Sequence, residues 1–172
     1  YNQHYVKHFF FGVMGRLSSS MPFVNQSGLA ELPLLTSQKA GNQTAFTQLL
    51  MGAYTFNQIQ ATDPVANVIT VPPGTYIFML ECSFTGVNPR FNCESRIIIN
   101  GVNYDKNASA YIRNASGHTE SGLTHIKPIT VTSNSTVELQ LAGRSGNGTL
   151  VTIIAGESKL TIQRTSKWQG LI

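Results

Sequence analysis

The histidines are the first residues of this sequence that could do chemistry. There are four of them: His4, His8, His118 and His125. The i, i+4 spacing of His4 and His8 would bring both to one face of a helix, where they could bind a metal ion. No third ligand or supporting residue accompanies them, so solvated or packed side chains are the better interpretation. His118 and Glu120 are two residues apart, so they would lie on the same face of a strand. Nothing nearby resembles a turn that presents a nucleophile.

The carboxylates are too few and too scattered to predict an acid–base site. The sequence has eight Asp and Glu residues, each isolated from the others. A glycosidase needs two carboxylates about 5–10 Å apart in a cleft. Only folding could bring together two of Glu81, Glu94, Glu120 and Glu138. The sequence also has no Walker loop, G-x-G-x-x-G, H-E-x-x-H or C-x-x-C motif. We therefore predict no catalytic residue, metal or cofactor, with a polysaccharide-degrading enzyme on a β-scaffold as an alternative.

The two cysteines, Cys82 and Cys93, flank the segment SFTGVNPRFN. A disulfide that closes this loop would contribute about 2–3 kcal/mol if the geometry allowed it. The other interpretation is a pair of free thiols, with Cys82 on the core-facing side of a strand. The sequence leaves both open.

Asn-x-Ser/Thr triplets are candidate glycosylation sites. They begin at Asn25, Asn42, Asn107, Asn114, Asn134 and Asn147. The abundance of Asn, Ser and Thr alone would give about two or three such triplets. They indicate either a glycosylated secreted protein or a bias toward small polar residues in turns, and we favour the bias.

The composition excludes some partners. Charged residues make up 12% of the chain, and the net charge of +4 comes from scarce acids rather than clustered bases. A nucleic-acid-binding protein would concentrate its Lys and Arg in a stripe, so we expect no nucleic-acid partner. No apolar run approaches the ~20 residues that span a membrane.

The segment VITVPPGTYIFMLECSF, which begins at Val68, constrains the elements that must position any site. It predicts a strand, a Pro-Pro-Gly turn and a second strand. Tyr76 and Phe78 alternate with Ile77 and Met79 in the second strand, so both of its faces are apolar. One face can fill the core of a sandwich, and the other needs a cover, most economically a second copy of the chain. All four residues are candidate interface residues, with Ile77 and Met79 as the leading pair.

From Ala45 onward the chain reads as short strands separated by turns. The expected strands are Ala45–Leu50, Tyr54–Gln60, Val68–Val71, Thr75–Phe84, Arg96–Asn100, Thr124–Val131, Thr136–Leu141, Leu150–Ile154 and Lys159–Arg164. Such spacing predicts an antiparallel β-sandwich or barrel over residues 45–172. Residues 1–44 lack the alternation and predict an N-terminal extended arm, which would dock through its apolar side chains. The docking residues would be Phe9, Phe10 and Phe11.

The region Tyr104–Ser121 has the character of an excursion at one end of the sandwich. It repeats Asn-Ala-Ser and carries aromatic, basic and imidazole side chains. Excursions on a rigid scaffold commonly carry binding surfaces. The candidate receptor-facing residues are Tyr104, Tyr111, Arg113 and His118.

The stretch from Ala45 to Arg164 resembles the trimeric jelly roll of the tumour necrosis factor and complement globular-head superfamily. The residues that carry the resemblance are AFT at 45, YTF at 54, ITVPPGTYIF at 69, IIING at 97, VELQL at 137 and SKLTIQR at 158. The closing strand is more similar to bacteriophage and viral fibre heads and capsid decoration proteins than to animal members. No collagen-like Gly-X-Y stalk precedes the domain, unlike in complement proteins. The resemblance implies a jelly-roll homotrimer with a binding or structural role, and it implies no catalytic residues. The second apolar face of the strand makes Ile77 and Met79 the leading candidates for the trimer interface.

The expected function is therefore a non-catalytic structural protein of a virion surface. It would be a capsid decoration (cement) trimer or a fibre head for host attachment. The arm would dock on a neighbouring virion protein, and the excursion would face a host glycan or protein. The alternative is a secreted, extracellular, glycosylated trimeric ligand or lectin-like module of a cellular organism.

Overall fold

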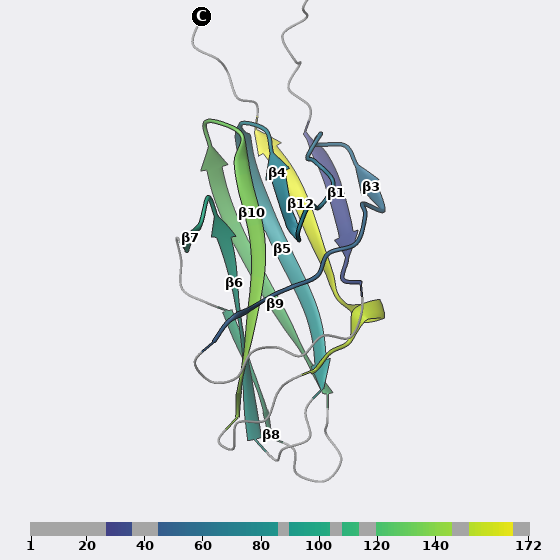
Figure 1. Ribbon diagram of the computed structural model, residues 1–172, viewed down its shortest axis with the longest axis vertical. Coiled ribbons are helices and arrows are strands. Elements are labelled where there is room, and N and C mark those ends of the chain that lie inside the picture. Colours follow the sequence, from purple (N-terminus) through teal and green to yellow (C-terminus); the bar gives the residue numbers. More distant parts are fainter. Residues whose placement is uncertain are drawn as a thin grey trace, which may run out of the picture.

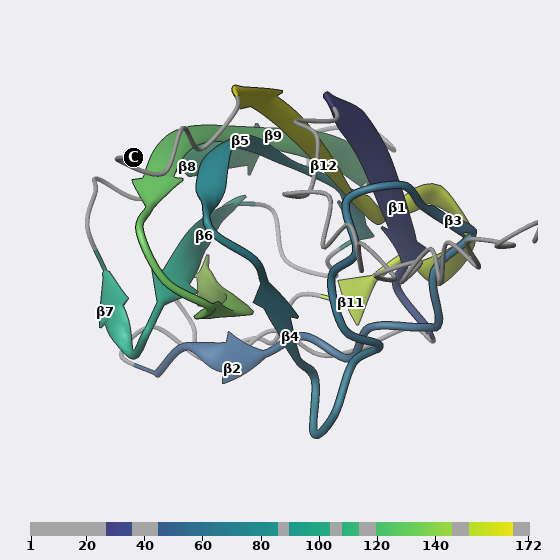
Figure 2. The same cartoon turned by 90° about the horizontal axis from the view of Figure 1, so that it is seen from above.

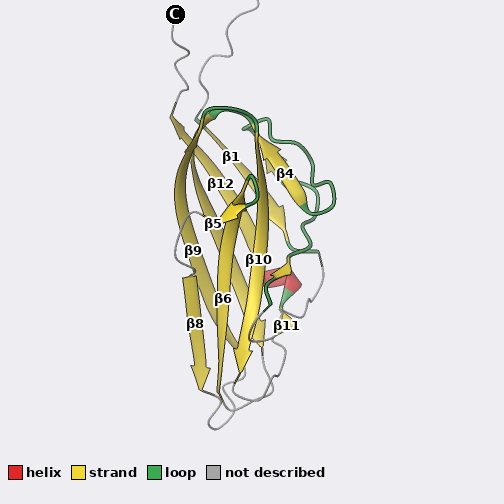
Figure 3. Ribbon diagram, turned by 60° about the vertical axis from the view of Figure 1, so that its left-hand side comes forward, coloured by secondary structure: helices red, strands yellow, loops and turns green. Residues whose placement is uncertain are grey.

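The structure is a computed structural model that describes residues 27–35, 45–85, 90–103, 108–113, 120–145 and 152–166. The regular elements of these residues are β-strands and one turn of 3-10 helix, Ala155–Glu157 (Figure 3). The strands pair antiparallel into two sheets, which form two facing layers (Figure 1; Figure 2). The predicted all-β antiparallel sandwich is confirmed.

The first sheet is built around β5 and is called the β5 sheet here. Its strands are, in spatial order, β9 (Glu120–Val131), β5 (Gly74–Thr85), β12 (Lys159–Ser166), β1 (Gly28–Pro33) and β3 (Phe56–Asn57). The short β11 (Thr152–Ile153) pairs with the end of β5. The β5–β9 ladder is unbroken over the whole of β5. Strand β12 pairs with the other edge of β5, so both edges of this strand are occupied by neighbours.

The second sheet is built around β10 and is called the β10 sheet here. Its strands are β2 (Thr47–Gln48), β10 (Ser135–Ser145), β6 (Arg90–Ile99) and β7 (Val102–Asn103), with β4 (Val68–Val71) on β10 and β8 (Ala108–Arg113) on β6. The β6–β10 ladder runs from Ile99 to Phe91 and forms the centre of this layer.

The core lies between the two sheets and follows the period of two along each strand. Strand β5 contributes Tyr76, Phe78, Leu80, Cys82 and Phe84, and β6 and β10 contribute Ile97, Ile99, Val137, Leu139 and Leu141. All of these side chains are at most 2% exposed. The buried phenol of Tyr76 donates a hydrogen bond to the carbonyl of Pro72 at 2.7 Å. Each sheet therefore has one face fully committed to the core.

Strand β1 corrects the expected boundary between arm and sandwich. Residues 28–33 were assigned to the arm, but they form a strand that pairs with β12 from Gly28–Arg164 to Pro33–Lys159. Ala30 and Leu32 are fully buried in the core. The inward residues of GLAELP do not form a clear apolar pattern in the sequence, because Gly28 and Ala30 have little or no side chain and so give only a weak hydrophobic signal. Residues 1–26 and 36–44, the rest of the predicted arm, lie outside the described residues.

Strand β8 corrects the expectation for the excursion. Residues 108–113 were expected in a loop, yet they pair with β6 from Ala108–Ser95 to Arg113–Arg90. The sequence ASAYIR has three small residues followed by three larger ones and shows no apolar alternation, so tertiary pairing rather than periodicity defines this strand.

Two tight turns use residues with positive φ. Asn100 (50°) and Gly101 (75°) connect β6 to β7, as the Asn-Gly pair predicts. Ala66 (49°) and Asn67 (61°) form the second turn, between Val65 and Val68, whose backbones exchange two hydrogen bonds of 3.0 Å. Glycine and asparagine tolerate this left-handed geometry, whereas alanine is strained by roughly 1–2 kcal/mol.

Replacing Ala66 with Asn should therefore raise the free energy of unfolding by about 1 kcal/mol, because the strain of the left-handed residue is relieved. The matched change in the other turn, Gly101→Ala, should lower it by about 1 kcal/mol. An added Cβ at Gly101 meets no atom within 4 Å, so only the backbone conformation would be at stake. Urea unfolding followed by circular dichroism measures both; an Ala66→Asn variant less stable than the parent would show that Ala66 is not strained.

Candidate interaction surface

The outer face of the β5 sheet is the candidate functional surface. Because its strands pair in register, the outward side chains form rows across four strands. One row consists of Pro128, Ile77, Gln163 and Leu29, and the next consists of Ile126, Met79, Thr161 and Glu31. Ile77 and Met79 lie in the interior of these rows, since β5 lies between β9 and β12.

The apolar side chains of this face are open to solvent in the single chain. Ile126 is 58% exposed, Phe56 40% and Leu29 39%, and Phe56 lies opposite Glu31 at the end of the second row. Ile77 and Met79 are partly exposed between them. Gln163 and Thr161 separate Leu29 and Phe56 from this group. Neighbouring exposed apolar side chains, such as Ile77, Met79 and Ile126, mark a surface that another molecule covers.

Charged groups gather at one end of this face. Lys159 Nζ donates a hydrogen bond to Glu31 Oε2 at 2.9 Å and lies 3.6 Å from Glu81 Oε2. The hydrogen bond to the Glu31 carboxylate raises the pKa of Lys159. Exposed ion pairs of this kind add little to stability. They can orient a partner that covers the neighbouring apolar rows.

The outer face of the β10 sheet differs, because side chains of the same chain cover its centre. The guanidinium of Arg96 lies 4.0 Å above the ring of Phe46, and Arg96 Nε donates to Gln140 Oε1 at 2.6 Å. Gln140 donates in turn to Glu138. Ile98, which points to the same side, is only 6% exposed. The central side chains of this face thus already have partners within the chain.

The four predicted interface residues divide between the two faces of β5. Tyr76 and Phe78 were expected among the trimer contacts, and this part of the prediction is wrong, because both are 0% exposed in the core. Ile77 and Met79 lie on the outer face, where a partner could reach them. Their role as trimer contacts stays a prediction.

Three apolar residues of the surface were not predicted from the sequence: Leu29, Phe56 and Ile126. Leu29 lies in the segment expected to be an arm. Ile126 lies in the sequence THIKPITV, where the polar His125 and Lys127 would be expected to face outward. The structure places Ile126 outward, because β9 pairs with Met79 of β5 at this residue. Predicting these three surface residues would have required the strand register, which cannot be derived from the sequence alone.

Both cysteines are free thiols in the structure, and both are buried. Cys82 extends inward from β5 and Cys93 inward from β6, so they lie on facing sheets. Burial raises the pKa of Cys82 to about 12, and it also raises the pKa of Cys93. Thiols react as thiolates, so neither side chain can serve as a nucleophile near neutral pH.

Ser95 and His125 make the one contact among the described residues that resembles a nucleophile and its base. Ser95 Oγ lies 2.9 Å from His125 Nδ1. Ser95 is 0% exposed and His125 5%, so both lie inside the sandwich. A substrate cannot reach this pair without opening the core, and the contact is structural: it satisfies two buried polar groups.

The carboxylates considered for hydrolysis do not converge. Glu81 lies on the outside of the β5 sheet, whereas Glu94 and Glu138 belong to the β10 sheet. Glu94 is opposite Ala142, four residues along β10 from Glu138, which separates them by roughly 13 Å. The side chain of Glu120 is outside the described residues. Within the described chain, no cluster of three or more His, Cys, Asp or Glu side chains could hold a metal ion.

Of the predicted receptor-facing residues, only Tyr111 has a described side chain. It projects from β8 and is 59% exposed. Arg113 pairs with Arg90 through its backbone. Tyr104 and His118 lie outside the described residues, as do Phe9, Phe10 and Phe11 of the predicted docking arm.

Two further sequence features concern location. Asn134, an exposed turn residue between β9 and β10, is the sole described asparagine of the Asn-x-Ser/Thr triplets. None of the described elements is a helix long and apolar enough to cross a membrane.

Comparisons with known proteins identify the fold. No protein-family model matches the sequence, and no curated protein matches it. Among solved structures, Eiger TNF from S. frugiperda is similar with a TM-score of 0.54 and 6% identity, over 84% of this chain and 96% of that one. Murine APRIL is similar with a TM-score of 0.53 and 8% identity, over 81% of this chain and 100% of that one. The chain shares the jelly-roll fold of these solved structures.

The comparisons support the fold part of the resemblance found in the sequence. The jelly-roll prediction is confirmed, with six to eight per cent identity to the two proteins just named. Such low identity shows a shared fold only. The similarity to viral fibre heads and capsid decoration proteins is not shown, because these neighbours come from S. frugiperda and mouse.

The buried thiols generate a prediction. In the native protein, Cys82 and Cys93 should react with Ellman's reagent far more slowly than a free thiol in water, because burial opposes formation of the thiolate. After unfolding in guanidinium without reductant, both should react at once. Native protein that gives no thiol signal even when unfolded would show instead that the two cysteines are bonded.

Proposed function

We propose that this protein is a non-catalytic binding module that acts as a homotrimer, held together through the outer face of its β5 sheet. One observation carries the proposal: the inner face of this sheet is already filled by the core, yet its outer face also presents a group of apolar side chains, in which Ile77 and Met79 lie beside Pro128 and Ile126. Such a face needs a cover that the described chain does not supply.

A second copy of the chain is the favoured cover for two reasons. The apolar side chains occupy the centre of the face and the charged Glu31, Lys159 and Glu81 lie toward one end, an arrangement like the apolar core and polar rim of subunit interfaces. The fold is also shared with tumour necrosis factor-type structures over more than four fifths of the chain. Closed rotational symmetry would let every copy bury the same face.

A ligand-like, extracellular role fits this surface better than an enzymatic one. The Ser95–His125 pair is enclosed in the core, and the carboxylates Glu81, Glu94 and Glu138 are spread over different sheets. Tyr111 on β8 offers an exposed aromatic side chain to a partner. We therefore favour a trimeric ligand or lectin-like module that binds a protein or glycan, and place it outside the cell.

The virion-surface role expected from the sequence has no support in the comparisons. It depends on the likeness of the closing strand to viral proteins and on docking by Phe9–Phe11. It remains a prediction of the sequence, and detection of the chain on assembled particles would test it.

The oligomer generates a direct prediction. The parent protein should sediment with about three times the 18.8 kDa mass of one chain. Met79→Asp should dissociate it to monomers at micromolar concentration, because the interface would bury an unpaired carboxylate from every subunit. Analytical ultracentrifugation measures both, with circular dichroism to show that the variant is folded.

Two control variants test whether the assignment of faces is correct. Val65→Asp places the same charge at a hairpin tip that is 75% exposed, and Glu138→Ala trims the outer face of the β10 sheet. Both should remain trimeric. A parent protein that is a stable monomer, or controls that dissociate as readily as Met79→Asp, would refute the proposal.

A further inference from the structure

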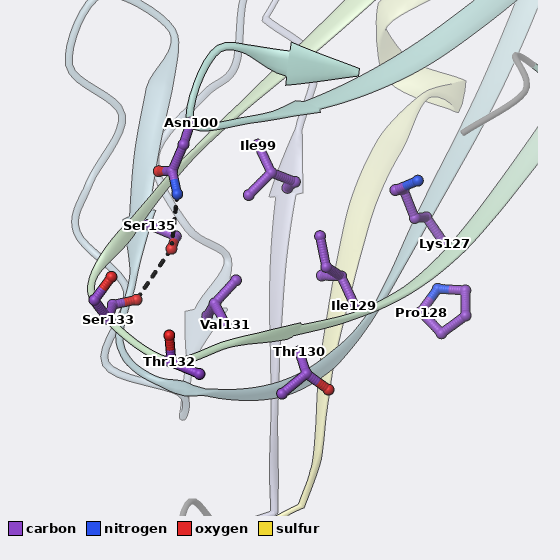
Figure 4. A pocket seen from close by; sticks show the side chains of 10 residues that line it. All are labelled: Ile99, Asn100, Lys127, Pro128, Ile129, Thr130, Val131, Thr132, Ser133 and Ser135. Carbon is purple, nitrogen blue, oxygen red and sulfur yellow. Dashed lines mark hydrogen bonds between the residues drawn. The ribbon is translucent and has the colours of Figure 1, made fainter. Parts of the chain in front are cut away.

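A cavity of about 480 Å³ lies at one end of the sandwich, and of the two outer rows of the proposed interface only Pro128 lines it. Strand β9 and the turn that follows it form one side, and the end of β6 and the start of β10 form the other (Figure 4). Its volume falls within the range of roughly 300–1,000 Å³ that is typical of small-molecule sites. The cavity is therefore large enough for an organic ligand.

One wall of the cavity is aliphatic. Ile129 and Val131 extend from the same side of β9, and Ile99 of β6 lies across from them (Figure 4). Ile99 and Val131 are at most 6% exposed, so the core holds this wall in place. A short hydrocarbon chain could pack on it.

The polar end of the cavity is formed by side chains that already bond to one another. Asn100 Nδ2 donates to Ser135 Oγ at 3.2 Å, and Ser135 Oγ donates to the carbonyl of Ser133 at 3.0 Å (Figure 4). Asn100 Oδ1 also accepts from the backbone N–H of Thr136 at 2.9 Å. These bonds fix the shape of the end wall and leave it less capacity to bind a ligand.

Lys127 is the one charged residue among the described residues that line the cavity. It extends from β9 on the same side as Ile129 and is 3% exposed (Figure 4). An ammonium group has three N–H donors, so it can hold an anion in addition to a partner within the protein. Hydrogen bonds between charged groups are stronger away from water, which favours an anion at this position.

We propose that this cavity binds a small organic anion, with a single carboxylate-type head on a short hydrocarbon chain. The head accepts hydrogen bonds from Lys127 Nζ, and the chain packs on Ile99, Ile129 and Val131. None of the described lining residues is a carboxylate, so the lining offers a cationic ligand no opposite charge. The site is contained in one chain and does not depend on the proposed trimer.

Hexanoate is the probe, with hexylamine as a cation of the same chain length and hexanol as a neutral molecule. In ¹H–¹³C NMR titrations of the full chain, hexanoate should shift the methyl signals of Ile99, Ile129 and Val131 and saturate, with a Kd of about 1 mM. Hexylamine should not bind, and hexanol should bind at least about tenfold more weakly, since it lacks the charge. Equal binding of hexanoate and hexylamine, or no saturable binding of hexanoate, would overturn the proposal.

Variants then locate the head of the ligand. Lys127→Met keeps the length of the side chain and removes its charge, and it should weaken hexanoate binding at least about tenfold. Lys159→Met removes an exposed ammonium from another part of the molecule and should leave the affinity unchanged. Equal loss in both variants would overturn the assignment of Lys127.

Two measurements keep the test independent of variant folding and of oligomeric state. Intermolecular NOEs in the parent protein should connect hexanoate to the methyl groups of Ile99 and Ile129, and NOEs only to Ile77 or Met79 would overturn the proposal. Met79→Asp should bind hexanoate like the parent whether or not the trimer forms. Failure of this site and failure of the proposed trimer are thereby distinguished.

Discussion

The pairing of β5 with β9 on one side and β12 on the other is the constraint on which the rest of the structure depends. The ladder with β9 extends over the full length of β5, and that with β12 extends over most of it. With both edges occupied, the backbone of β5 is committed to its neighbours in the sheet. Its period of two then sends Tyr76 and Phe78 into the core and Ile77 and Met79 to the outer face. The core and the candidate interaction surface are thus two sides of the same register.

Register also explains why β9 carries its polar residues inside. Pairing with β5 places Leu123, Ile129 and Val131 inward, and the same period forces His125 and Lys127 inward with them. A slip of one residue would bury Ile126 instead, but it would expose the three apolar residues. The structure accommodates the polar pair differently at each position: Ser95 meets His125, and Lys127 lies beside a cavity. The buried Ser95–His125 contact and the position of Lys127 beside the cavity therefore both follow from the register of β9 on β5.

The two outer faces of the sandwich differ in whether side chains of the same chain cover them. On the β10 sheet, Arg96 and Phe46 stack across the face and Gln140 links Arg96 to Glu138, so the chain covers itself. On the β5 sheet, apolar side chains remain exposed and the ion pairs of Lys159 are confined to one end. The difference favours function at the β5 sheet, and the solved structures of similar fold support only the architecture on which that surface is built.

The sequence alone determined the fold class and the extent of β5, because alternation sustained over ten residues matches the period of a strand and not that of a helix. It predicted only parts of β6, β9 and β10, which extend beyond the expected ranges. It also determined that Ile77 and Met79 share a face opposite to Tyr76 and Phe78. Only the tertiary structure decided which of the two faces is the core, that Gly28–Pro33 and Ala108–Arg113 are strands, and that Leu29, Phe56 and Ile126 join Ile77 and Met79. Short or weakly patterned strands gain their hydrogen bonds and burial from partners far away in the chain. Local sequence does not contain that information, and neither does it fix the register that assembles a surface from four or five strands.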